Sequence, residues 1–128
     1  MPEQEAPPAA SNEEEAILQA VMTNLQGLRE ENVELAMSAI DPDSLIYDST
    51  RSFSEQLFAL YDLEYEVLEL TVETISGTEA SVHFIQVTRK VSGPDFRDNR
   101  VEGAHLLHKV DGSWLIYETR VDSVDYLN

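Results

Sequence analysis

The 128-residue sequence contains no cysteine and very few basic residues. Without cysteine the chain forms no disulfide, no thiolate nucleophile and no zinc site built on cysteine. The first twelve residues do not resemble a signal peptide, because they are acidic and rich in Pro and Ala, with neither a basic start nor an apolar run. No stretch approaches the ~20 apolar residues that a membrane span requires. These absences predict a cytoplasmic protein.

The charge is strongly of one sign: 8 Lys and Arg stand against 25 Asp and Glu, a net charge of −17. Phosphate binding needs Lys and Arg clustered on one face, so this balance argues against nucleic acid as a partner. It argues equally against anionic membrane surfaces. Only two lysines occur, Lys90 and Lys109. An acidic, lysine-poor surface suits a salt-rich cytoplasm, and both a halophilic source and a merely acidic protein are compatible with it.

The first half of the chain has apolar residues at helical spacing. We read residues 1–12 as a solvated tail and residues 13–128 as a single domain. Ser11 and Glu14 match a capping box in front of a helix whose apolar stripe ends at Leu28.

Two further helices are expected before the sheet begins. A short one is predicted over residues 33–39, and Asp41-Pro42 ends it because proline disfavours helix in the preceding residue. After an irregular segment, 43–49, a third helix begins near Thr50 and runs to about residue 61.

After Asp62 the apolar period changes from 3.6 to 2, which indicates strands. The strands are expected through residues 67–73, 80–91, 99–110 and 113–122, and Leu68, Leu70 and Val72 form the apolar face of the first. Asp111-Gly112 predicts a two-residue hairpin turn between the last two strands. The fold class is therefore α+β, with N-terminal helices packed on a curved, mainly four-stranded antiparallel sheet.

The Asp111-Gly112 turn also predicts which residues of the last hairpin lie opposite one another. In that register His105 faces Glu118 and Gly103 faces Arg120, on the face that we place against the helices. One end of this inward face is apolar. Its other end is polar, and we expect it to line a water-accessible cavity at the open end of the sheet; it comprises Gln86, Thr88, His105, Glu118 and Arg120.

The outward face of the sheet is expected to be too apolar for water. A patch of this kind exceeds what monomers usually expose, so the sequence predicts a homodimer packed sheet to sheet. The residues of the expected interface are Ile85, Val87, Leu106, Leu115, Tyr117 and Val121.

The pattern over residues 13–124 resembles the nuclear transport factor 2-like superfamily. The sharpest local signal is the hairpin Leu106-Leu107-His108-Lys109-Val110-Asp111-Gly112-Ser113-Trp114-Leu115-Ile116. The resemblance implies a cystatin-like, cone-shaped fold with an internal cavity. It also implies relatives among ketosteroid isomerases and polyketide cyclases (SnoaL-like proteins), and a prokaryotic source. The isomerases place a Tyr on the first helix and an acidic base after the second. Asp41 or Asp43 falls near that base, but the apolar stripe of the first helix carries no oxyanion donor.

The best candidate site is the group His105, Glu118 and Arg120. His105 would act as general base, Glu118 would orient it, and Arg120 would stabilise negative charge or clamp a carboxylate. The alternative is a buried polar network with a purely structural role. Further ligand contacts are expected from Gln86, Thr88, Tyr47, Tyr61 and Trp114.

A second candidate is a basic cluster around the loop 92–98, in which Arg97 and Arg100 bind an anion or pair with local carboxylates. No metal site is predicted, because His105 and His108 lie three apart on a strand and face opposite sides. No cofactor is expected either.

Three functions follow from these residues. The first is a small-molecule-binding homodimer with a cavity between helices and sheet. The second is a cofactor-independent lyase or isomerase that uses His105. The third is a structural module that contacts a protein partner through residues 92–99.

Overall fold

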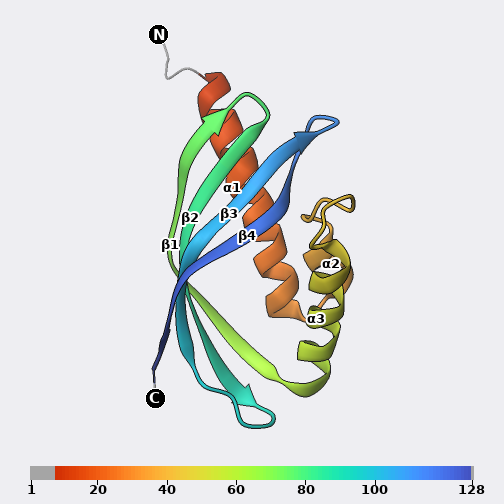
Figure 1. Cartoon of the computed structure of the whole chain (residues 1–128), viewed down its shortest axis with the longest axis vertical. Helices are drawn as coiled ribbons and strands as arrows, with labels where there is room; N and C mark the ends of the chain where they lie inside the picture. The colour runs from red at the N-terminus through yellow and green to blue at the C-terminus, as the bar shows by residue number, and fades with distance from the viewer. Residues whose placement is uncertain (1–7, 128) are drawn as a thin grey trace.

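The computed structural model describes the backbone of residues 8–127, and side chains from Glu13 onward. Three helices are followed by one antiparallel sheet (Figure 1). The helices are α1 (Pro8–Glu30), α2 (Val33–Met37) and α3 (Tyr47–Leu60), and the strands are β1 (Asp62–Ser76), β2 (Glu79–Ser92), β3 (Asn99–Val110) and β4 (Ser113–Tyr126). The strands lie in chain order, each antiparallel to the next. The predicted α+β class is confirmed.

Helix α1 begins at Pro8, upstream of the expected start. Ser11 therefore lies inside the helix, and the prediction that it is the N-cap is wrong. Proline is favourable in the first turn of a helix, and the two alanines after it are strong helix formers. Residues 1–7 of the expected tail lie outside the described residues. The apolar stripe is as predicted, since Ile17, Val21 and Leu25 are buried.

Helices α2 and α3 differ from expectation at their ends. Asn32 caps α2, because its side chain accepts a hydrogen bond from the backbone N–H of Leu35 at 3.0 Å. α2 ends at Met37, two residues earlier than predicted. α3 begins at Tyr47, so the prediction of irregular structure for residues 43–49 is wrong for the last three.

The segment after α2 attaches to the free edge of β4. The backbone N–H of Ile116 donates to the carbonyl of Ala39 at 2.8 Å, and the N–H of Asp41 donates to the carbonyl of Ile116 at 2.9 Å. Ile40 and Ile116 thus form a parallel bridge. This attachment closes the core, which consists of Ile17, Val21, Met37, Ile40, Ala80, Val82, Leu107, Trp114 and Ile116.

The turn between β3 and β4 forms as predicted, with positive φ at Asp111 (49°) and Gly112 (85°). The expected register holds as far as Leu107 opposite Ile116. There the register shifts, so that β4 carries one extra residue, a β-bulge. A second shift follows between Glu102 and Gly103. The prediction of one constant register is therefore wrong beyond Leu107.

Bulges also change β1, where the register shifts between Val67 and Glu69. Leu68 is 49% exposed and does not share the inward face with Leu70 and Val72, against expectation. Figure 1 shows the consequence of these irregularities, because all four strands bend and twist midway along the sheet.

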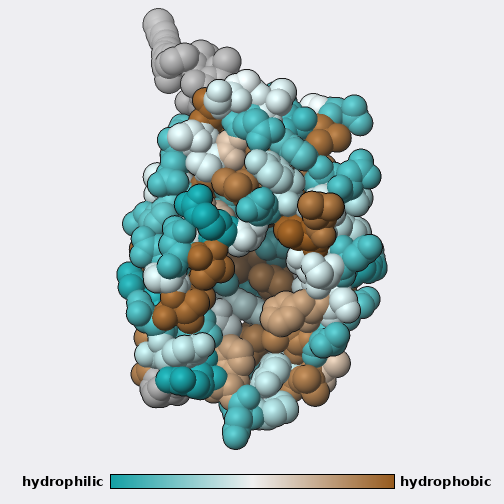
Figure 2. Space-filling view, viewed as in Figure 1, coloured by the Kyte–Doolittle hydropathy of each residue, from teal (hydrophilic) through white to brown (hydrophobic). Residues whose placement is uncertain are grey.

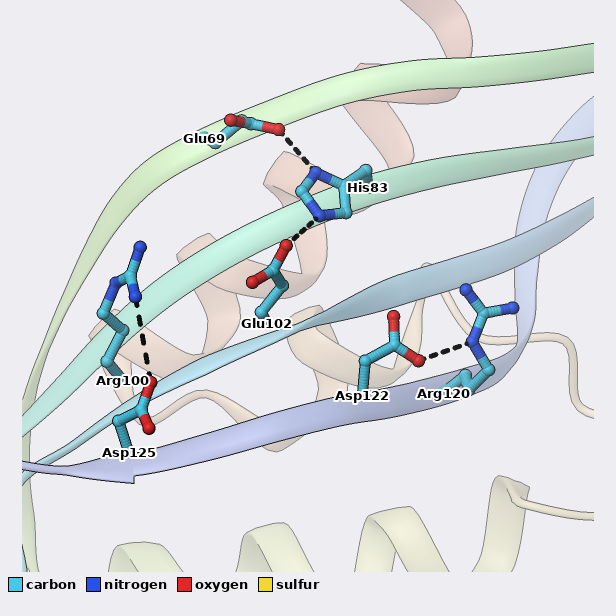
Figure 3. Close-up of polar contacts among 7 residues, drawn as sticks. All are labelled: Glu69, His83, Arg100, Glu102, Arg120, Asp122 and Asp125. Carbon is cyan, nitrogen blue, oxygen red and sulfur yellow. Dashed lines mark hydrogen bonds and ion pairs between the residues drawn. The ribbon is translucent and has the colours of Figure 1, made fainter.

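The outward face is less apolar than the alternation predicted. Val121 pairs with Gly103 and so changes face, because the bulge shifts it by one position. Val87 is only 3% exposed, while Ile85, Leu106, Leu115 and Tyr117 are partly buried. The same face carries ionic side chains from all four strands (Figure 3). The expected contiguous apolar patch is therefore interrupted by charge.

Candidate functional site

A cavity of about 210 Å³ lies between α1 and the inner face of the sheet. Figure 2 shows the surface hollowed, with apolar residues around the hollow. Of the described residues that line the cavity, seven are apolar and four are polar. They are Val21, Asn24, Leu25 and Leu28 from α1, Val67 and Leu70 from β1, Phe84 and Gln86 from β2, Val101 and His105 from β3, and Thr119 from β4.

The helical wall of the cavity follows from the spacing of α1. Val21, Leu25 and Leu28 lie one turn apart and therefore share one face of the helix. Asn24 lies on the same face, and its Nδ2 donates to the carbonyl of Ala36 at 2.9 Å. This bond joins α1 to α2 and leaves the side-chain oxygen of Asn24 without a partner among the described residues.

Among the described residues of the cavity wall, His105 is the one that titrates. Its ring stacks on Phe84, with ring centroids 4.4 Å apart and planes inclined by 18°. Its Nδ1 lies 2.9 Å from the hydroxyl of Thr119, whereas its Nε2 has no hydrogen-bond partner within residues 13–127. Burial lowers the pKa of His105 to about 4. The imidazole is therefore neutral at neutral pH, and it can donate or accept one further hydrogen bond.

Glu118 and Arg120 do not join His105. Glu118 pairs with Leu106 and is exposed. Arg120 pairs with Ala104, and its Nε donates to Asp122 at 2.9 Å on the outward face (Figure 3). The expectation that the three side chains converge is wrong, because the bulge moves Glu118 and Arg120 to the opposite face.

Gly103 is the signal in the sequence that marks the second shift of this ladder, between Glu102 and Gly103. A Cβ at this position would lie 2.0 Å from the carbonyl oxygen of Arg120. Only glycine permits this approach of two backbones, and an isolated glycine in a strand often marks a bulge.

Of the other expected ligand contacts, Gln86 lines the cavity and the remaining four residues do not. Trp114 is 5% exposed and belongs to the core, and Tyr47 packs against that core. Tyr61 donates its hydroxyl to the carbonyl of Asp95 at 3.2 Å and lies 5.4 Å from the ring of Phe96. Thr88 pairs with Tyr65 and Asn99 within the sheet.

The basic residues near the loop 93–98 have partners within the chain. Arg97 lies over the ring of Tyr126 at 3.9 Å, a cation–π contact. Arg100 lies 3.8 Å from a carboxylate oxygen of Asp125. Arg100 thus pairs with a local carboxylate, as the alternative to anion binding anticipated, whereas this contact of Arg97 is with an aromatic ring.

Two ion networks outside the cavity were not anticipated. Asp41 is 5% exposed and accepts a hydrogen bond from the backbone N–H of Asp43, which lowers the pKa of its carboxyl. It also contacts Nε2 of His108, whose ring stacks on Tyr117 at 4.5 Å. Neither Asp41 nor Asp43 lines the cavity, so neither has the position of an isomerase base.

The second network joins three strands on the outward face. His83 lies between two carboxylates, with Nδ1 2.5 Å from Glu69 and Nε2 2.8 Å from Glu102 (Figure 3). Hydrogen bonds to Glu102 and Glu69 raise the pKa of His83.

Two negative findings apply to the described part of the chain. Within it, no cluster of three or more His, Cys, Asp or Glu side chains is arranged to hold a metal ion. None of its helices is both long and apolar enough to span a bilayer.

Solved structures of similar fold show the fold class to which this chain belongs. A putative scytalone dehydratase from Novosphingobium aromaticivorans superposes with a TM-score of 0.74 at 16% identity, over 96% of this chain and 93% of that one. An NTF2-like protein of unknown function from Pseudomonas putida gives a TM-score of 0.72 at 13% identity, over 88% and 87%. The predicted nuclear transport factor 2-like fold is confirmed, and identities this low show the fold alone.

The sequence comparison is more specific. Residues 19–127 match the family described as anti-sigma-I factor RsgI9, C-terminal domain, so the chain belongs to that family. A curated relative, the anti-sigma-I factor RsgI9 of Acetivibrio thermocellus, is 38% identical over 77 residues. The matched segment covers 60% of this chain and 11% of that protein, so the chain spans about a tenth of the relative's length.

Proposed function

We propose that this domain binds a small, largely apolar molecule between α1 and the sheet, and that it serves as the ligand-binding part of a regulatory protein. The observation that carries the proposal is the cavity of about 210 Å³ with its mainly apolar wall. A dry apolar cavity of about 150 Å³ is already large enough for benzene. The space therefore suits a ligand the size of one substituted ring.

The family supports the regulatory setting. The relative is named as an anti-sigma-I factor, and the matched family is the C-terminal domain of that protein. A domain that forms about a tenth of such a protein fits a sensing role, in which occupancy of the cavity alters the rest of the chain.

The chemistry of the cavity favours binding over catalysis. An efficient general base has a pKa near the working pH, whereas burial lowers the pKa of His105 to about 4. Glu118 and Arg120, which would have assisted it, lie on the outward face. A lyase or isomerase that uses these three residues as one unit thus has no support from the geometry. The loop 93–98 also packs on its own chain, through Tyr61 and Phe96, which leaves a protein-docking role there with less support.

Toluene is a suitable first probe, because it is apolar and about the size of the cavity. We expect it to shift the methyl NMR signals of Val21, Leu25 and Leu70 in a saturable manner. Val101→Phe fills the cavity from β3 and should abolish the shifts. Val91→Phe introduces the same ring at a site that is 61% exposed and outside the cavity, and should retain them.

The proposal fails if no lining methyl responds to toluene, or if both variants respond as the wild type does. His105→Ala separates binding from catalysis, since binding should survive the loss of the imidazole and proton transfer should not.

A further inference from the structure

The polar groups of the cavity are all uncharged. Among the described residues that line it there is no Asp, Glu, Lys or Arg, although the chain holds 33 such residues in all. The four polar lining residues offer amide, hydroxyl and imidazole groups: Asn24, Gln86, Thr119 and His105. One group of ionic side chains pairs instead on the outward face, at Glu69, His83, Glu102, Arg100 and Asp125 (Figure 3).

His105 supplies no charge to this space at neutral pH. Its imidazole is held between the ring of Phe84 and the hydroxyl of Thr119, neither of which is ionised. Its pKa of about 4 agrees with this uncharged surrounding. Nε2 of His105 and the side-chain amide of Gln86 have no hydrogen-bond partner among the described residues, so they are free to bond a polar group on a ligand.

We infer that the cavity selects an electrically neutral ligand: a single ring or a chain of similar size that carries one hydroxyl or carbonyl group. The inference rests on the ligand-binding function proposed above. A carboxylate or an ammonium ion of the same size would lose its hydration on entry and find no opposite charge, and a buried unpaired ion is strongly disfavoured. A hydroxyl or carbonyl would instead exchange its water for His105 or Gln86.

The net charge of −17 opposes part of this selectivity. The surface field repels anions and attracts cations. A carboxylate is therefore rejected both by this field and by the uncharged cavity wall, whereas an ammonium ion is rejected by the cavity wall alone. The cationic ligand is therefore the decisive test, and it is best made at about 0.15 M salt or above, where the Debye length is about 8 Å or less.

Three ligands of matched size separate the causes: benzyl alcohol, benzoate and benzylamine, each titrated at pH 7 with the methyl signals of the cavity as readout. We expect benzyl alcohol to bind at least tenfold more tightly than either ion. If benzoate or benzylamine binds as tightly as benzyl alcohol, the inference is overturned while the ligand-binding function stands. If none of the three binds although toluene does, the inference is likewise overturned. If toluene also fails to bind, both this inference and the proposed ligand-binding function are overturned.

A single added charge tests the cause directly. Gln86→Glu places a carboxylate in the cavity wall with almost no change of shape, and should improve the affinity for benzylamine at least tenfold while weakening benzyl alcohol. Gln56→Glu adds the same charge on the exposed surface of α3 and should change neither. Equal effects of the two variants on benzylamine would overturn the local explanation. The wild-type comparison needs no variant, so it decides the inference even if Gln86→Glu does not fold.

Discussion

Thr119, and not Glu118, lies opposite His105 in the β3–β4 ladder. The extra residue at the bulge replaces a carboxylate by a hydroxyl as the neighbour of the imidazole, with Nδ1 and Oγ1 2.9 Å apart. A carboxylate there would have favoured the charged imidazolium, whereas the hydroxyl carries no charge and does not favour that form. One inserted residue thus gives the cavity its uncharged character.

We expect His105 to titrate far below His83. Its pKa in the folded chain is about 4, against about 6.5 in an unfolded chain. The unfolded state therefore takes up the proton first, and the free energy of unfolding decreases as the pH falls from about 6.5 to about 4. The loss attributable to His105 is roughly 3 kcal/mol at most. NMR titration of the imidazole and urea unfolding at several pH values measure the two effects.

His105→Gln is the control for this prediction, because it keeps a polar side chain that does not titrate. The variant should lose less stability than the wild type between pH 6.5 and 4. A measured pKa near 6.5 for His105 would contradict the neutral cavity.

We expect Gly103→Ala to disturb both the fold and the cavity. The added Cβ would lie 2.0 Å from the carbonyl oxygen of Arg120, so the two strands must move apart. The expected cost is about 3 kcal/mol, the upper end of the range for overpacking, and the His105–Thr119 pairing next to it should be lost. Urea unfolding gives the first effect and toluene binding gives the second.

Gly112→Ala is the matched substitution in the hairpin turn. A Cβ there has no heavy atom within 4 Å, and only its φ of +85° is unfavourable. It should cost about 1 kcal/mol and leave toluene binding intact. Equal destabilisation by the two variants would show that the close approach at Gly103 is not rigid.

The contrast between β2 and β4 explains how far the sequence could predict the site. Hydrophobic period and turn residues are local properties, so helices, strands and the Asp111-Gly112 turn were predictable. β2 and β3 pair without a register shift, and Gln86 and His105 indeed line the cavity. Beyond the bulge, a shift of one residue places Glu118 and Arg120 on the outward face, opposite to the predicted one. The contribution of α1 depends on how the helix lies across the sheet, which no local pattern specifies.

On the outward face we expect His83 to make stability depend on pH in the opposite sense from His105. Hydrogen bonds to Glu102 and Glu69 raise its pKa above the ordinary value of 6.5. The stabilisation is then fully present below about pH 6.5 and is lost as the pH rises through the raised pKa of the folded state. NMR titration of His83 and unfolding at pH 6 and pH 9 test this.

Glu102→Gln should lower the pKa of His83 towards 6.5 and reduce the loss of stability at high pH. Glu66→Gln, on the same strand as Glu69 but paired with Arg89, should leave the pKa of His83 unchanged. If His83 in the wild type has a pKa at or below 6.5, the two carboxylates do not hold it as described.

Homodimerisation through the outward face stays a prediction, and the structure indicates where to test it. Leu106 lies on this face, partly buried, on the same side of the sheet as Ile85, Leu115 and Tyr117. If two copies pack through these side chains, Leu106→Asp places an unpaired carboxylate in an apolar interface and should give a monomer. Leu45→Asp is the matched control, because Leu45 is fully exposed before α3, and it should remain a dimer. Light scattering at micromolar concentration measures the mass directly. A wild type that is already monomeric there would mean that the ionic network around His83, rather than a second copy, is what keeps this face soluble.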